Sequence, residues 1–136
     1  MPLTLVAWIF LFFITMDLKF YNKYNNKTLP DDGYRVSEEY KKFQRDLYSD
    51  MKKLAKEKGM EITAKSHGHY FESYFFKNGD KYVYVHHESL NRTFIDLDSG
   101  AFFLVRTAKN DKDYTGGAND YCCYSNLVLK LIKYFA

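Results

Sequence analysis

The chain has 136 residues, a length that fits one domain with one modest core and leaves no room for a second domain. Its formal net charge is +3, and its 20 basic and 17 acidic residues are interleaved, which weakens a nucleic-acid-binding role and argues against an acidic mimic of DNA. Aromatic residues reach 19%, with 13 Tyr and 12 Phe, a composition that favours β-sheets and contact surfaces.

The N-terminus begins with an apolar run from Leu3 to Thr15, shorter than the roughly 20 residues of a membrane span. The run has no basic residue before it and no small-residue cleavage site after it, so both flanks of a secretory signal are missing. We expect residues 1–15 to be an apolar tail, or an upstream extension if Met16 is the natural start. A short membrane anchor is the second alternative, and a cleaved signal is the last.

An irregular arm and then a helix are expected next. Residues 16–35 are polar and contain the turn sequence Leu29-Pro-Asp-Asp-Gly33. Ser37 is a candidate N-cap, and Gly59 is a candidate C-terminal stop. Between them, apolar residues recur at helical spacing: Tyr40, Phe43, Leu47, Met51 and Leu54.

After Gly59 the apolar period changes to two, which predicts antiparallel strands. A first strand is expected around Met60, Ile62 and Ala64. Two hairpins follow. The first pairs residues 69–76 with 81–88 across Asn78-Gly79, and the second pairs 93–97 with 101–106 across Asp98-Ser99-Gly100.

A short amphipathic helix is expected at the C-terminus, with Ser125 as its cap. Its apolar positions are Leu127, Val128, Leu131, Ile132, Tyr134 and Phe135. The predicted fold is therefore a two-layer α+β domain spanning residues 36–136, with an N-terminal helix, an antiparallel meander of four to five strands and a short C-terminal helix.

The first hairpin places candidate metal ligands together. With Asn78-Gly79 as the two turn residues, Phe71 lies opposite His86, and His69 lies opposite Glu88. Four residues that suit zinc or general acid–base chemistry then share one face: His67, His69, His86 and Glu88. Because aromatic residues occupy the same face, its other interpretation is the core side of the sheet.

A polar, glycine-bearing loop follows the apolar stretch that ends at Arg106, and such loops commonly carry function. Gly116-Gly117 lacks the Gly-Lys-Ser/Thr ending of a phosphate loop, so these glycines are expected to let the chain double back. The candidate partner-binding residues are Arg106, Lys109, Lys112, Asp113, Tyr114, Gly116, Gly117 and Asn119.

The loop and the first hairpin carry a resemblance. The string Arg106-Thr-Ala-Lys-x-x-Lys-Asp-Tyr-Thr-Gly-Gly-x-Asn119, preceded by the Asn-Gly hairpin, resembles small proteins encoded on phages and plasmids of low-GC bacteria. The resemblance covers about residues 60–130. It implies a binding protein, of a kind that includes anti-CRISPR inhibitors of host defence, and supplies no catalytic residues.

The leading hypothesis is a non-enzymatic interaction protein, without a cofactor, that binds a protein partner such as a host defence nuclease. The adjacent Cys122 and Cys123 favour a reducing compartment, here the bacterial cytoplasm. One alternative is a nucleic-acid-binding accessory protein that uses Lys109, Lys112 and the lysines of the first helix. Another is a metal-dependent enzyme centred on the histidine cluster. Membrane contact is expected only if residues 3–15 insert.

Overall fold

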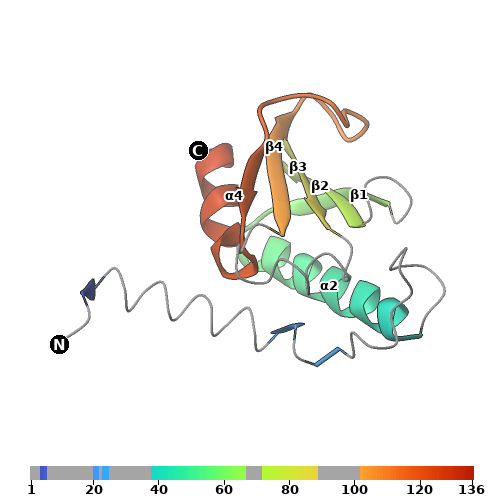
Figure 1. Ribbon diagram of the computed structural model, residues 1–136. Helices are drawn as coiled ribbons and strands as arrows, with labels where there is room; N and C mark the ends of the chain where they lie inside the picture. The colour runs from blue at the N-terminus through green and yellow to red at the C-terminus, as the bar shows by residue number, and fades with distance from the viewer. Residues whose placement is uncertain (1–3, 6–19, 22, 25–37, 67–71, 89–101) are drawn as a thin grey trace.

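The protein is an α+β domain, as the sequence predicts, in a computed structural model that describes residues 4–5, 20–21, 23–24, 38–66, 72–88 and 102–136 (Figure 1). The helices are α2 (Glu38–Glu57) and α4 (Leu127–Phe135), with a short 3-10 turn (Tyr124–Asn126) before α4. The strands are β1 (Glu61–Ser66), β2 (Glu72–Asn78), β3 (Lys81–His87), β4 (Phe103–Ala108) and β5 (Asp120–Cys122).

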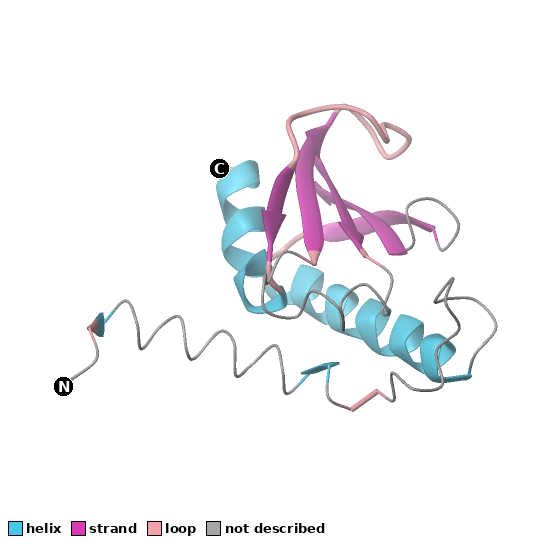
Figure 2. Cartoon of the chain, in the orientation of Figure 1, coloured by secondary structure: helices cyan, strands magenta, loops and turns pink. Residues whose placement is uncertain are grey.

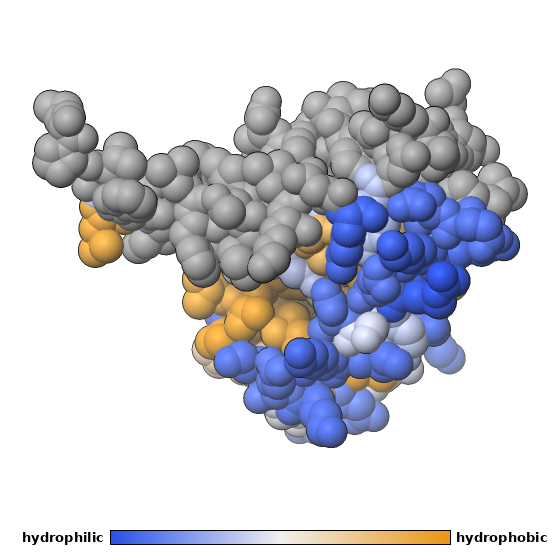
Figure 3. All heavy atoms as spheres, turned by 90° about the horizontal axis from the view of Figure 1, so that it is seen from below, coloured by the Kyte–Doolittle hydropathy of each residue, from blue (hydrophilic) through white to orange (hydrophobic). Residues whose placement is uncertain are grey.

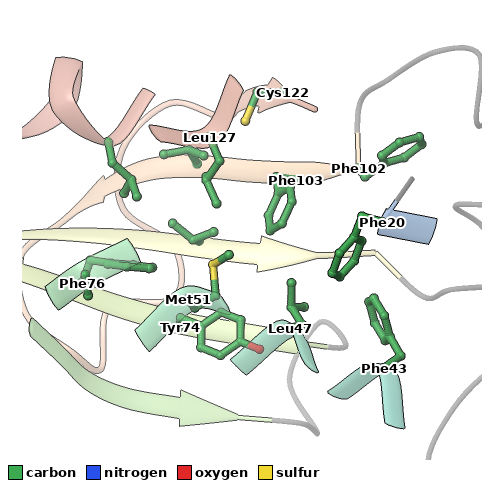
Figure 4. Packing of buried hydrophobic residues seen from close by; sticks show 14 of the residues in the cluster. Phe20, Phe43, Leu47, Met51, Tyr74, Phe76, Phe102, Phe103, Cys122 and Leu127 are labelled. Atoms are coloured by element: carbon green, nitrogen blue, oxygen red, sulfur yellow. The ribbon is translucent and has the colours of Figure 1, made fainter. Parts of the chain in front are cut away.

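The five strands form one antiparallel sheet in the order β1-β2-β3-β4-β5, and both helices pack on the same face (Figure 2). Alternate residues of each strand point toward the helices, among them Tyr74, Phe76 and Phe103, and they meet Leu47 and Met51 of α2 in the core (Figure 4). The sheet therefore has one face covered by helices and one face left to the loops.

Helix α2 forms where the apolar spacing predicts it. Its buried stripe recurs every three or four residues: Tyr40, Phe43, Leu47, Met51 and Ala55. The helix ends in a Schellman motif, in which the Met60 amide donates to the Ala55 carbonyl at 2.8 Å and Gly59 adopts a φ of 69°. The predicted Gly59 stop is confirmed, whereas Ser37, the predicted cap, lies outside the described residues.

Part of the predicted N-terminal arm belongs to the core. Phe20, Tyr21 and Tyr24 are buried, and the Tyr21 hydroxyl lies 2.6 Å from Nε2 of His87. Phe20 stacks on Tyr124 with the ring centroids 4.3 Å apart. The core thus includes residues that precede position 36, where the domain was expected to start.

The first hairpin forms, but the predicted register is wrong by two residues. Asn78 pairs with Lys81, so the turn residues are Gly79 and Asp80, and His86 lies opposite Ser73. Gly79 takes a φ of 60°, the positive value that both two-residue hairpin turns require at their first central position. In Asn78-Gly79-Asp80, either Asn78-Gly79 or Gly79-Asp80 can adopt the positive φ values of a two-residue turn. The pairing of the two long strands selects Gly79-Asp80.

The pairing predicted for the second hairpin is also corrected. Strand β4 pairs with β3 on one side and with β5 on the other, so its edges are taken by strands other than 93–97, a segment outside the described residues. Strand β5 was not predicted.

The predicted cap of the C-terminal helix is also corrected. Ser125 lies in the 3-10 turn, and Asn126 holds the N-cap position of α4.

Most of the apolar run Leu3–Thr15 lies outside the described residues. In the part of the chain that the structure describes, no helix combines the length and the apolar character needed to cross a membrane.

Candidate functional site

The candidate site is the loop of residues 109–119, which joins β4 to β5 at the end of the sheet remote from α2 (Figure 1). Beneath it lies a small apolar cluster of Phe75, Tyr84 and Leu104 on the sheet face that the helices leave open. The Tyr114 ring packs against this cluster, with its centroid 5.1 Å from that of Phe75 and 5.7 Å from that of Tyr84. Tyr114 therefore holds the middle of the loop against the sheet.

Arg106 ties the middle and the C-terminal end of the loop to β4. Its Nη1 donates to Oδ1 of Asn119 at 3.1 Å, and its Nη2 donates to the backbone carbonyl of Tyr114. The guanidinium also lies over the Tyr84 ring, with Cζ 4.6 Å from the centroid. Because Arg106 is only 9% exposed and is engaged inside the protein, the contacts that the structure shows for it position the loop.

Asp113 closes the loop from within. Its carboxylate accepts the backbone N–H of Lys109 at 2.9 Å and that of Thr115 at 3.3 Å. These hydrogen bonds, that from Lys109 first, hold the pKa of Asp113 below its ordinary value. Asp113 thus accepts hydrogen bonds from within the loop, and its role as a contact residue stays a prediction.

The two glycines allow close packing. Gly117 has a φ of 72°, and a Cβ placed on it would lie 2.6 Å from the backbone oxygen of Thr107. A Cβ on Gly116 would overlap the Asp113 carboxylate. This agrees with the expectation that the glycines let the chain double back, and it explains why a larger residue does not fit there.

The loop presents cations to solvent. Lys109 and Lys112 are exposed, and neither ammonium forms an ion pair with a carboxylate among the residues described. The eight predicted contact residues therefore divide into two groups. Lys109 and Lys112 face solvent, and their side chains make no hydrogen bond that holds the loop in the described part of the chain. The others build the loop, with Gly117 and Asn119 exposed as well; these six are Arg106, Asp113, Tyr114, Gly116, Gly117 and Asn119.

The sequence analysis did not single out Tyr84 and Thr107 as parts of the site. The Tyr84 ring packs against both Arg106 and Tyr114. Gly117 packs closely against the backbone of Thr107. Tyr84 could have been predicted from the alternation of side chains along the strands. Phe75, Tyr84 and Arg106 lie side by side on the same face of three neighbouring strands.

The predicted metal cluster is only partly described. His67 and His69 lie outside the described residues, and the corrected register removes the predicted pairing of His69 with Glu88. His86 and Glu88 do lie together, with Nε2 3.9 Å from Oε1. Within the described ranges, no three His, Cys, Asp or Glu residues are grouped in a way that would hold a metal ion.

His86 belongs to a row of polar groups on the open face of the sheet. The Tyr84 hydroxyl lies 3.1 Å from both Ser73 Oγ and His86 Nδ1. Burial raises the pKa of Tyr84, so the phenol stays protonated at neutral pH. Ser73 is 1% exposed and therefore cannot contact a substrate. Its hydrogen bond and that of His86 hold the Tyr84 ring in place under the loop.

Comparison with known proteins adds no relative, because no protein-family model, no curated protein and no solved structure matches this chain.

Proposed function

We propose that the protein is a non-enzymatic binding protein that contacts a protein partner through the loop of residues 109–119. The proposal is based on the observation that some residues of the loop fix its backbone while others remain exposed. Buried Arg106 and internal Asp113 fix its backbone, while Lys109 and Lys112 remain exposed. A loop fixed before binding loses little conformational entropy in a complex, so its contacts count almost fully toward affinity.

The charge of the loop indicates the chemistry of the partner surface. Two exposed ammonium groups on an ordered loop, neither of them in an ion pair among the described residues, favour an acidic patch, which steers association and sets the orientation. The resemblance of Arg106–Asn119 to mobile-element proteins supports a host defence nuclease in the bacterial cytoplasm as that partner. Such nucleases interact with DNA through basic grooves, so an inhibitor that presents Lys109 and Lys112 would contact an acidic surface outside the groove.

The experiment is affinity capture from a lysate of a low-GC bacterium, with mass spectrometry of the bound proteins. Tagged wild-type protein is compared with Lys109→Glu/Lys112→Glu and with the control Lys53→Glu/Lys58→Glu, which makes the same charge change at exposed positions of α2 and its end. We expect one partner to be captured by wild type and control and to be lost from the loop variant.

The captured partner is then assayed for nuclease activity with and without the protein. Inhibition by wild type and control, but not by the loop variant, is expected. Capture of no partner at physiological salt, or equal capture by all three proteins, contradicts the proposal.

A further inference from the structure

Most charges of helix α2 lie on two flanks of opposite sign, although they alternate along the sequence. Lys42 beside Asp46 and Glu38 beside Lys41 are exceptions. Asp46 and Asp50 lie on the flank that faces the N-terminal segment and the 3-10 turn, where they accept hydrogen bonds from Tyr24 at 2.7 Å and from Tyr124. Lys41, Arg45 and Lys52 lie on the flank that faces β1. A positive stripe therefore runs along one side of the helix.

This stripe borders a hollow between α2 and the edge strand β1. The hollow has a volume of about 210 Å³ and is lined by Lys41, Gln44, Arg45, Tyr48 and Lys65. Seen from the α2 side, the described surface is mostly hydrophilic, and its hydrophobic part gathers toward the side where α4 stands (Figure 3). The hollow thus lies on a polar side of the molecule and has cationic walls.

The walls of the hollow are held in place. The Tyr48 ring stacks on buried Tyr74, with centroids 6.0 Å apart and ring planes at 19°. Gln44 donates to the buried carboxylate of Glu72 at 2.7 Å. Two ammonium groups lie against the Tyr48 ring, that of Lys65 at 3.8 Å and that of Lys52 at 4.5 Å from the centroid.

The cations of the hollow are largely uncompensated. Lys41 pairs with Glu38 at 3.3 Å, on the exposed surface. Arg45, Lys52 and Lys65 make no ion pair with any carboxylate in the described part of the chain. Like charges gathered around one hollow repel each other, and an anion bound there relieves that repulsion.

We propose that this hollow binds the phosphate groups of a single-stranded nucleic acid. Its volume is below the roughly 300–1,000 Å³ of a pocket that encloses a whole small ligand, and it suits one phosphate group of a longer chain. The guanidinium of Arg45 and the ammonium groups of Lys41 and Lys65, which come from two elements, offer several donors to the oxygens of a phosphate. Lys52 and Lys56 continue the stripe, about 6 Å apart along the helix axis, toward the next phosphates.

The site is separate from the proposed contact loop, because it is lined by residues of α2 and β1, whereas the loop lies at the end of the sheet remote from α2 (Figure 1). Its lysines on α2 were among those expected from the sequence to bind nucleic acid, whereas Arg45 and Lys65 were not. The two proposals are therefore tested by different variants, Lys109→Glu/Lys112→Glu for the loop and Arg45→Glu/Lys65→Glu for the hollow.

The test is fluorescence anisotropy with the full chain and a labelled DNA strand of about 15 nucleotides, at about 50 mM salt and above. Arg45→Glu/Lys65→Glu is compared with Lys53→Glu/Lys58→Glu, which makes the same change in net charge away from the hollow. We expect the hollow variant to weaken binding at least about tenfold and to reduce the slope of log K against log salt by about 0.7, the value for the one phosphate that the hollow holds. The control is expected to weaken binding less than the hollow variant does, because its charges lie away from the bound phosphate.

Circular dichroism checks that each variant keeps the wild-type fold. If Arg45→Glu/Lys65→Glu does not fold, Arg45→Gln/Lys65→Gln is used in its place. Three outcomes overturn the proposal. They are no binding by wild type at low salt, equal weakening in the hollow and control variants, and displacement of the strand by polyglutamate as effectively as by unlabelled DNA.

Discussion

Replacing Arg106 with Met tests whether this residue holds the loop. The change removes two hydrogen bonds with a charged donor, at about 1.5–3 kcal/mol each, and the stacking on Tyr84, at about 1 kcal/mol. Part of this loss is offset, because Arg106 Nε is buried without a hydrogen-bond partner among the described residues, which costs about 1–3 kcal/mol. Water also reaches the freed Tyr114 carbonyl. We expect the free energy of unfolding to fall by about 2–4 kcal/mol.

Urea denaturation followed by circular dichroism measures that loss. Lys112→Met is the matched control, because it removes one positive charge from an exposed position of the same loop and should change the stability by no more than about 0.5 kcal/mol. If Arg106→Met is no more destabilising than Lys112→Met, Arg106 does not clamp the loop and the reasoning is refuted.

Two further predictions concern buried contacts. Burial lowers the pKa of His87 from 6.5 to about 4, so the stability that depends on neutral His87 is complete above pH 6.5 and is lost as the pH falls to 4, by about 3 kcal/mol. Urea denaturation at pH 7 and pH 4 measures it, and a loss of the same size in His87→Gln would show that another group titrates. Gly117→Ala should cost at least about 2 kcal/mol, because a positive φ and contact with Thr107 both oppose the new Cβ, whereas Gly79→Ala should cost about 1 kcal/mol for its φ alone. Equal losses in the two alanine variants would mean that the close approach of Gly117 is unimportant.

The elements predicted correctly are those with strong local signals. The stripe Tyr40–Met51 and the glycine at 59 specify α2 through contacts within a few residues. The turn at Gly79 likewise specifies a hairpin. Its register depends instead on how two whole strands pair, so it was missed by two residues. Strand β5 has only three residues and no room for an alternating pattern.

The roles of individual side chains were harder to predict, because they depend on contacts between distant segments. Arg106 looks like a solvent-facing cation in a sequence, yet it lies under a loop that returns eight and thirteen residues later. The charges of α2 look interleaved because Arg45 and Asp46 are neighbours. On a helix they lie about 100° apart, and each continues a row of its own sign.

The central claim is that the loop of residues 109–119 is ordered before any partner binds. Amide hydrogen exchange in the free protein, read residue by residue by NMR, tests it most directly. The account predicts that the amides of Lys109 and Thr115, which donate to Asp113, exchange at least about tenfold more slowly than in an unstructured peptide. Exchange of these two amides at the unprotected rate, while the amides of α2 remain protected, would contradict it.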